Sequence, residues 1–119
     1  FHLDTIFTPV LDKDKNLAAM IASLELMTAD SKERLLNLAK KKCIRLLDVP
    51  ASDAIGTSEV LGEFAVNCLP MPGYLIGPTR FHSKEVDDHL KEVGVMHITV
   101  PLTQYRLSGG AVHCLTNEL

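Results

Sequence analysis

The stretch that decides the fold covers residues 2–24 and reads HLDTIFTPVLDKDKNLAAMIASL. It contains two runs rich in apolar and β-branched residues, 2–11 and 17–24, on either side of the polar segment 12–16. Runs of this composition around a short polar turn predict two strands that pair as a hairpin.

A helix and a third strand are expected after this hairpin. Asp30 with Glu33 three residues later resembles a capping box, and the apolar residues that follow lie on one face of a helix over 31–41. The apolar run 43–49 ends before Pro50, which cannot extend a sheet ladder, so it predicts a buried strand. The expected order is ββαβ.

The second half of the chain repeats this order. Strands are expected at 63–69 and 74–76, around a turn that contains proline and glycine. A helix begins after Ser83 and ends at Gly94, and a further strand covers 95–100. The sequence therefore predicts an α+β fold built from two ββαβ units.

Charge and cysteine content exclude several classes of protein. The 119 residues carry a net charge of −3, which gives no basic surface for nucleic acid. Apolar stretches are shorter than the roughly 20 residues that a membrane helix needs, so no membrane partner is expected. Three cysteines without CxxC spacing argue against a disulfide framework and favour a reducing compartment, the cytoplasm.

The residues that could carry out chemistry lie at the two ends of the chain. Cys114 follows a Gly109-Gly110 pair, which lets a loop present a sulfur atom. His2 and Asp4 are two residues apart, so on the first predicted strand their side chains share one face. Together they offer a nucleophile, a base and a carboxylate.

Segments 2–8 and 109–116 resemble the two halves of the active site in the guanidino-group-modifying superfamily, the penteins. Its members include arginine deiminases, dimethylarginine dimethylaminohydrolases and amidinotransferases, and Asn67-Cys68-Leu69 resembles the dimethylaminohydrolase branch. The resemblance implies a propeller of five ββαβ units. This chain would supply two of them, about 1–49 and 50–119, as the C-terminal portion of a single pentein domain. The missing N-terminal units, or self-association, would cover its open edges.

The resemblance also implies roles for individual residues. Cys114 would attack the central carbon of a small guanidino substrate, and His2 would act as general acid and base. Asp4 would bind the guanidinium through paired hydrogen bonds. His113 and Asn67 are expected to support the site. No cofactor and no metal are required.

Three functions stay open from the sequence. The first is a hydrolase of arginine or a methylated arginine that works through a covalent thiouronium intermediate. The second is an amidinotransferase, in which an amine replaces water. The third is a catalytically incomplete fragment or a binding module; His2, Asp4, His113 and Cys114 could all bind zinc, but their spacing matches no zinc pattern.

The remaining candidate residues are expected to be structural. Cys43 and Cys68 lie in predicted apolar strands and are expected to be buried there. Arg106 is expected on an exposed loop. Three histidines without a motif are expected on the surface or on helix faces: His82, His89 and His97.

Overall fold

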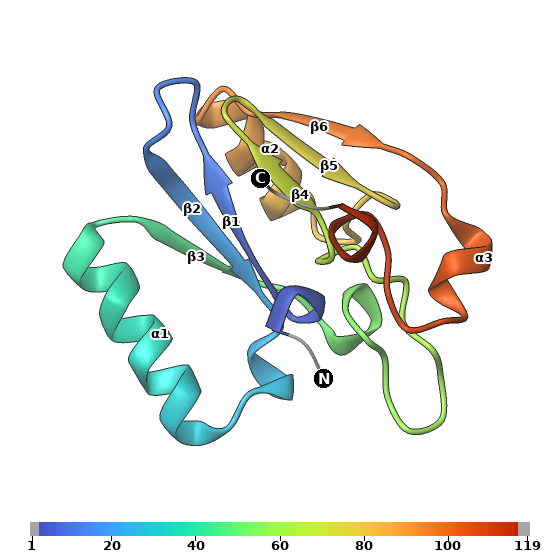
Figure 1. Cartoon of the computed structure of the whole chain (residues 1–119). Helices are drawn as coiled ribbons and strands as arrows, with labels where there is room; N and C mark the ends of the chain where they lie inside the picture. The colour runs from blue at the N-terminus through green and yellow to red at the C-terminus, as the bar shows by residue number, and fades with distance from the viewer. Residues whose placement is uncertain (1–2, 117–119) are drawn as a thin grey trace.

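The structure, a computed structural model, describes residues 3–116 of the chain. Within them, two three-stranded sheets are arranged in strand orders β1-β2-β3 and β4-β5-β6. Figure 1 shows the two sheets next to each other, each with one longer helix. The predicted ββαβ order is confirmed in both halves. The division into units 1–49 and 50–119 of one larger domain stays a prediction.

The first sheet forms around the N-terminal hairpin. Strand β1 (Phe7–Leu11) pairs antiparallel with β2 (Leu17–Ala22), and β2 pairs parallel with β3 (Arg45–Asp48). Helix α1 (Ala29–Lys42) makes the crossover that a parallel pair requires. The middle strand is buried over its last four residues, as expected for a strand with neighbours on both sides.

The second sheet has the same topology. Strand β4 (Leu69–Met71) pairs antiparallel with β5 (Tyr74–Gly77), and β5 pairs parallel with β6 (Met96–Thr99) after helix α2 (Lys84–Glu92). The sequence predicts two features of this helix. Val86 and Leu90 are buried on one face, and Gly94 follows the end of the helix with φ of 74°.

One core joins the two sheets. Strand β1 lies next to β4, and buried side chains from both halves form a single cluster. Val10 and Leu47 come from the first half, and Leu75, Val86 and Leu90 come from the second. The two units therefore fold against each other around one shared core.

Short helical turns lie around the junction of the two sheets. Near the N-terminus is η1 (Leu3–Thr5), and near the C-terminus are α3 (Thr103–Arg106) and η4 (His113–Leu115). Two further turns, η2 (Leu24–Leu26) and η3 (Ala51–Asp53), follow β2 and β3. Figure 1 shows η1 and η4 at the same side of the molecule, although they are separated by almost the whole chain.

Two predicted strands are much shorter than expected, while those predicted over 17–24, 43–49 and 95–100 differ by one or two residues at their ends. The first begins at Phe7, because the Ile6 N–H donates to the Leu3 carbonyl at 3.0 Å and closes the η1 turn. The prediction that Asp4 lies on a strand is therefore wrong. The strand predicted over 63–69 is also wrong in its first six residues, where Phe64 has φ of 56° and the Asn67 N–H donates back to the Phe64 carbonyl. Of the predicted strand 63–69, only Leu69 belongs to an observed strand, β4.

Helix α1 begins and ends differently from the prediction. Its N-cap is Thr28, whose hydroxyl accepts from the Ser31 N–H at 3.2 Å, whereas Asp30 pairs with Arg34 one turn along. Cys43 is the C-cap with φ of 53° and is exposed, so the prediction of a buried strand position is wrong. The C-cap therefore falls on the first residue of the predicted strand, and the observed strand β3 begins two residues later, at Arg45.

His97 is a further correction. Alternation along β6 turns Met96 and Ile98 outward and His97 inward, where its ring lies 5.3 Å from that of Phe81, centroid to centroid. Burial, and then the charge of Arg80, lower the pKa of His97 to about 4, so the ring is neutral at pH 7. His82 is largely exposed as expected, and His89 is buried on the inner face of α2.

Across residues 3–116, no helix has both the length and the apolar character needed to cross a membrane.

Candidate active site

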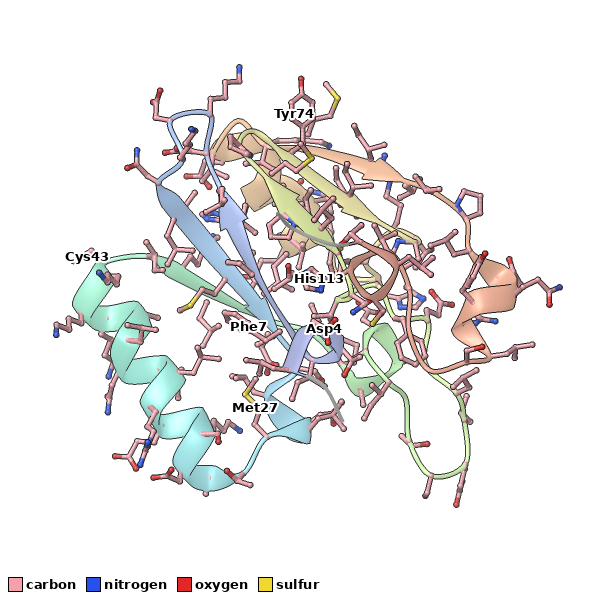
Figure 2. The ribbon with its side chains drawn as sticks, in the orientation of Figure 1. Asp4, Phe7, Met27, Cys43, Tyr74 and His113 are labelled. Atoms are coloured by element: carbon pink, nitrogen blue, oxygen red, sulfur yellow. The ribbon has the colours of Figure 1, made fainter. Side chains whose placement is uncertain are left out.

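The two ends of the described chain meet at the carboxylate of Asp4. Its Oδ2 atom lies 2.9 Å from Nδ1 of His113 and 3.3 Å from Sγ of Cys114. Figure 2 shows Asp4 on the η1 turn and His113 close to it. The fold thus brings together a carboxylate, an imidazole and a thiol from residues that are more than 100 positions apart.

Asn67 lies beneath this group and contacts both ends. Its side chain is fully buried, and its Nδ2 donates to the backbone carbonyl of Asp4 at 2.9 Å and to Oδ2 of Asp4 at 3.1 Å. Its Oδ1 accepts from the backbone N–H groups of Ala111 at 2.8 Å and Cys114 at 3.3 Å. The turn that shortens the predicted strand is what places Asn67 there.

The glycine pair before Cys114 shapes the loop in two ways. Gly109 has φ of 88°, a left-handed conformation that favours glycine. At Gly110 an added Cβ would lie 2.8 Å from the sulfur and 2.9 Å from Cβ of Cys114, so only glycine leaves room for that side chain. The expectation that Gly-Gly lets the loop present Cys114 agrees with this geometry, and Cys114 is exposed.

A hollow of about 290 Å³ opens beside the sulfur. Asp4 and Cys114 line it together with Tyr105, Ser108 and the glycine pair. Oδ1 of Asp4 is buried and makes no hydrogen bond with any of residues 3–116. Buried carboxylate oxygens normally have a hydrogen-bond partner, so Oδ1 leaves Asp4 with unused acceptor capacity beside the hollow.

The hydrogen bonds at Asp4 shift two pKa values in opposite directions. Burial raises the pKa of Asp4, but hydrogen bonds from Cys114, His113 and Asn67 outweigh it, and the pKa lies below its usual range. Burial also raises the pKa of the Cys114 thiol, and the hydrogen bond and charge of Asp4 raise it further. The site without a ligand therefore holds a carboxylate beside a thiol that is mostly protonated at neutral pH.

The structure brings together four of the five candidate residues from the sequence: Asp4, Asn67, His113 and Cys114. His2, the expected acid and base, lies outside the described residues. Asn67 contacts more of the candidate site than the sequence suggested. The only sequence feature that pointed to it was its position as a polar residue within an apolar run. Tyr105 and Ser108 carried no sequence signal, because their place beside the hollow depends on the path of the loop.

The other cysteines are not at this site. Cys68 is buried, its Sγ lies 2.9 Å from the Ala65 carbonyl, and burial raises the pKa of its thiol far above the ordinary value. The prediction that Cys68 is buried is confirmed, while Cys43 is exposed at the end of α1. In the part of the chain that the structure describes, no group of three or more histidine, cysteine or acidic side chains has an arrangement that could hold a metal ion.

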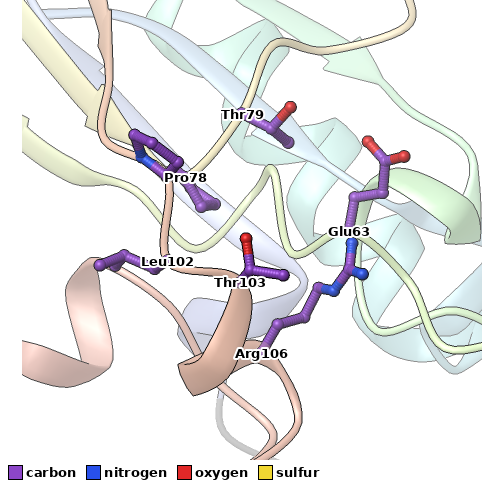
Figure 3. A pocket seen from close by; sticks show the side chains of 7 residues that line it. Glu63, Pro78, Thr79, Leu102, Thr103 and Arg106 are labelled. Atoms are coloured by element: carbon purple, nitrogen blue, oxygen red, sulfur yellow. The ribbon is translucent and has the colours of Figure 1, made fainter.

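The prediction that Arg106 lies on an exposed loop is wrong. Arg106 is the last residue of the short helix α3, and its Nε atom is buried. It lines a second hollow of about 220 Å³ together with Glu63, Thr79 and Thr103. Figure 3 shows the Arg106 side chain extending from α3 toward the segment that carries Glu63. None of the residues that line this hollow also lines the hollow at Cys114.

Comparison by sequence finds no matching family model and no matching curated protein. Comparison by structure gives consistent matches. AgrE in a ternary complex with ornithine and NAD+ has a TM-score of 0.71 and 25% identity. The product-bound N-terminal domain of ArgZ, an arginine dihydrolase from the ornithine–ammonia cycle in Cyanobacteria, has a TM-score of 0.68 and 24% identity. An asparagine-to-serine variant of that domain, covalently bound to a reaction intermediate, has a TM-score of 0.66 and 22% identity.

These matches cover 97% of this chain but only part of each neighbour: 15% of AgrE and 36% of the ArgZ N-terminal domain. The chain thus corresponds to a fragment of these larger enzymes. AgrE and ArgZ belong to the pentein superfamily, and this chain has the fold of a part of a pentein domain, in agreement with the resemblance of its two end motifs.

Proposed function

We propose that this chain is the cysteine-bearing, C-terminal part of a hydrolase that acts on a guanidino compound such as arginine or a methylated arginine. The observation that carries this proposal is the environment of Asp4. One carboxylate oxygen contacts both His113 and Cys114, the other is buried without a partner among residues 3–116, and Asp4 lines the hollow together with Cys114. AgrE, 25% identical to this chain, is described with bound ornithine, which supports an amino acid of the arginine type.

A guanidinium cation matches this environment in charge and in hydrogen bonding. It is planar and carries several N–H donors, and a carboxylate binds it by two parallel hydrogen bonds. Oδ1 of Asp4 offers an unused acceptor. A cation next to Asp4 also offsets the negative charge that raises the pKa of the Cys114 thiol. Substrate binding is thus expected to favour the thiolate at the time when the reaction needs it.

The reaction would proceed in two steps at Cys114. The thiolate attacks the central guanidino carbon, a C–S bond forms, and a C–N bond breaks as the leaving amine takes a proton from His2. Water then gives a proton to His2 and attacks the thiouronium carbon, and the C–S bond breaks to return the thiolate. The role of His2 comes from the family resemblance. An ArgZ variant is described with a covalently bound reaction intermediate, in keeping with this scheme.

This chain contains only part of the machinery that such a reaction needs. Penteins that hydrolyse arginine-like substrates use a further carboxylate from another unit, and arginines that hold the substrate's own carboxylate. Since the chain spans 36% of the ArgZ N-terminal domain, we place those groups on the units that this chain lacks. The complete enzyme, rather than these 119 residues alone, is expected to turn over substrate.

Product analysis tests the proposal on the longest natural form of the protein. With L-arginine, we expect ammonia without an added amine, and Cys114→Ser should lower the rate by about 1000-fold or more. Cys43→Ser is the matched control and should leave the rate unchanged, because Cys43 is exposed at the end of α1. A product that forms only with an acceptor amine would show an amidinotransferase instead. An equal rate in Cys114→Ser would contradict the proposal.

A further inference from the structure

We infer that Asn67 is a positioning residue that holds the carboxylate of Asp4 and the loop of Cys114 in register, so that both face one guanidinium group. Its role in a reaction rests on the function proposed above. The contacts that carry the inference can be tested without any substrate.

Every hydrogen-bonding position of the Asn67 amide is directed at the candidate active site. An asparagine side chain has two N–H donors and two acceptor lone pairs. Nδ2 donates twice to Asp4, and Oδ1 accepts from the N–H groups of Ala111 and Cys114. The Asn67 carbonyl also accepts from the His113 N–H at 3.3 Å. One fully buried residue therefore ties the N-terminal turn to the loop that carries the nucleophile.

The orientation of the amide is fixed by these partners. Turning it over would place Oδ1 against two oxygen atoms of Asp4 and Nδ2 against two backbone N–H groups, so all four bonds would become repulsive. Position 67 thus needs a donor on one side and an acceptor on the other. Aspartate has the same shape but lacks the donors, and it would place a second carboxylate beside Asp4.

The consequence of this contact is an asymmetry between the two oxygens of Asp4. Oδ2 is occupied by Asn67, His113 and Cys114, while Oδ1 has no partner among residues 3–116. By holding Oδ2, Asn67 fixes which oxygen is left for a ligand. By binding the Cys114 N–H, it also fixes where the sulfur lies relative to that oxygen. An attack on a bound guanidinium carbon requires a fixed relation of this kind between the binding carboxylate and the sulfur.

The test compares Asn67→Asp with Asn37→Asp, which makes the same chemical change on the exposed surface of α1. Iodoacetamide alkylation of Cys114 is followed against pH by peptide mass spectrometry, and the exposed Cys43 in the same molecule serves as internal reference. In Asn67→Asp we expect the pH midpoint of Cys114 alkylation to rise by about one pH unit or more. At neutral pH, this corresponds to alkylation that is about tenfold slower. Cys43, and both cysteines in Asn37→Asp, should keep their wild-type profiles.

A purely structural role for Asn67 makes the opposite prediction. A loosened loop would expose Cys114, speed its alkylation and move the midpoint toward the value of a free cysteine, about 8.5. That result would overturn the inference. The two proposals can also be separated. If the alkylation midpoint of Cys114 rises in Asn67→Asp but the wild-type protein forms no adduct with guanidino compounds, the positioning role is supported and the proposed hydrolase is contradicted.

A reversed pair covers the case in which Asn67→Asp does not fold. In the double variant Asp4→Asn with Asn67→Asp, the amide and the carboxylate exchange places, and a side-chain hydrogen bond between positions 4 and 67 can form again. We expect the double variant to fold if Asn67→Asp does not, and to unfold at a higher temperature than Asn67→Asp if both fold. Equal or lower thermal stability would contradict a direct contact between the two side chains.

Discussion

The two carboxylate oxygens of Asp4 have different surroundings, and this difference makes the site chemically useful. Oδ2 is held by three protein groups, so the carboxylate cannot rotate without breaking several contacts. Oδ1 is buried without a partner among residues 3–116, which costs free energy until a donor arrives. At the scale of single residues, these surroundings fit the proposed substrate, whose guanidinium group is a donor-rich cation, beside the thiol of Cys114.

Replacing Asp4 by asparagine should change binding and thiol reactivity in opposite directions. Turnover of a guanidino substrate should fall by about 30-fold or more, since losing one partner of a buried ion pair costs about 2 kcal/mol or more. The carboxylate also raises the pKa of the Cys114 thiol, so without it that pKa should fall. Alkylation of Cys114 at pH 7 should then be about two- to tenfold faster than in the wild type. Kinetics with substrate and with iodoacetamide measure both effects, and a parallel loss of both would be inconsistent with this account.

Asp4 should also contribute to the pH dependence of stability. Its pKa in the folded state lies below the ordinary value, because its hydrogen bonds outweigh burial. The ionised form therefore stabilises the fold above about pH 4, and this contribution is lost as the pH falls through the folded-state pKa. Urea unfolding between pH 6 and 2 should show a smaller loss of stability in Asp4→Asn than in the wild type. An equal or larger loss would mean that Asp4 is not stabilised in its charged form.

The repeated ββαβ order could be predicted from the sequence because each strand and helix has a strong local pattern. The apolar runs of β2 and β5 and the amphipathic face of α2 are examples. The turns at the site could not be predicted in the same way. The segment before β4 is apolar enough for a strand, and distant partners, such as the Asp53 carbonyl that accepts from the Val66 N–H, act together with the local turn bonds to keep it out of the sheet. The same holds for Asp4, whose turn is tied to Asn67.

The loop before Cys114 gives a prediction at the scale of a structural element. Gly110→Ala should slow covalent modification of Cys114 by a guanidino substrate by about tenfold or more, because the new methyl group would lie within 3 Å of the cysteine side chain. Gly109→Ala is the control. It introduces backbone strain of about 1–2 kcal/mol, but its methyl group would have no atom within 4 Å.

Adduct formation and thermal unfolding distinguish the two glycine variants. Gly109→Ala should lower stability while leaving the chemistry of Cys114 nearly intact. Gly110→Ala should mainly impair the chemistry. Equal rates of adduct formation in both variants would show that the close contact at Gly110 is unimportant.

At the scale of the whole molecule, the second sheet presents an apolar row to solvent. Met71 is paired with Tyr74 across β4 and β5, and Tyr74 is paired with Met96 across β5 and β6. The three residues therefore form a row across the sheet. All three are exposed, and β6 is at the edge of its sheet in the described residues. Exposed apolar side chains at an open edge favour association. This agrees with a chain that spans only part of its structural neighbours.

We therefore expect the isolated chain to associate as its concentration rises. Met96→Lys should weaken this association by about tenfold, since it places a charge on the edge strand and removes the most exposed side chain of the row. Sedimentation velocity over a range of concentrations measures the effect. Lys84→Met on the exposed surface of α2 changes charge without touching the row and serves as control. A wild-type chain that stays monomeric at all concentrations would contradict this expectation.

The measurement that tests the central claim most directly is the mass of Cys114 after incubation with a guanidino substrate. The wild-type protein, as this chain and within a longer natural product, is quenched with acid and mapped by peptide mass spectrometry. The account predicts an amidino adduct on Cys114, none on Cys43, and none at position 114 in Cys114→Ser. An adduct only in the longer form would mean that the missing units complete the site. No adduct on Cys114 in either form, with the fold intact, would contradict the claim that this cysteine is the nucleophile.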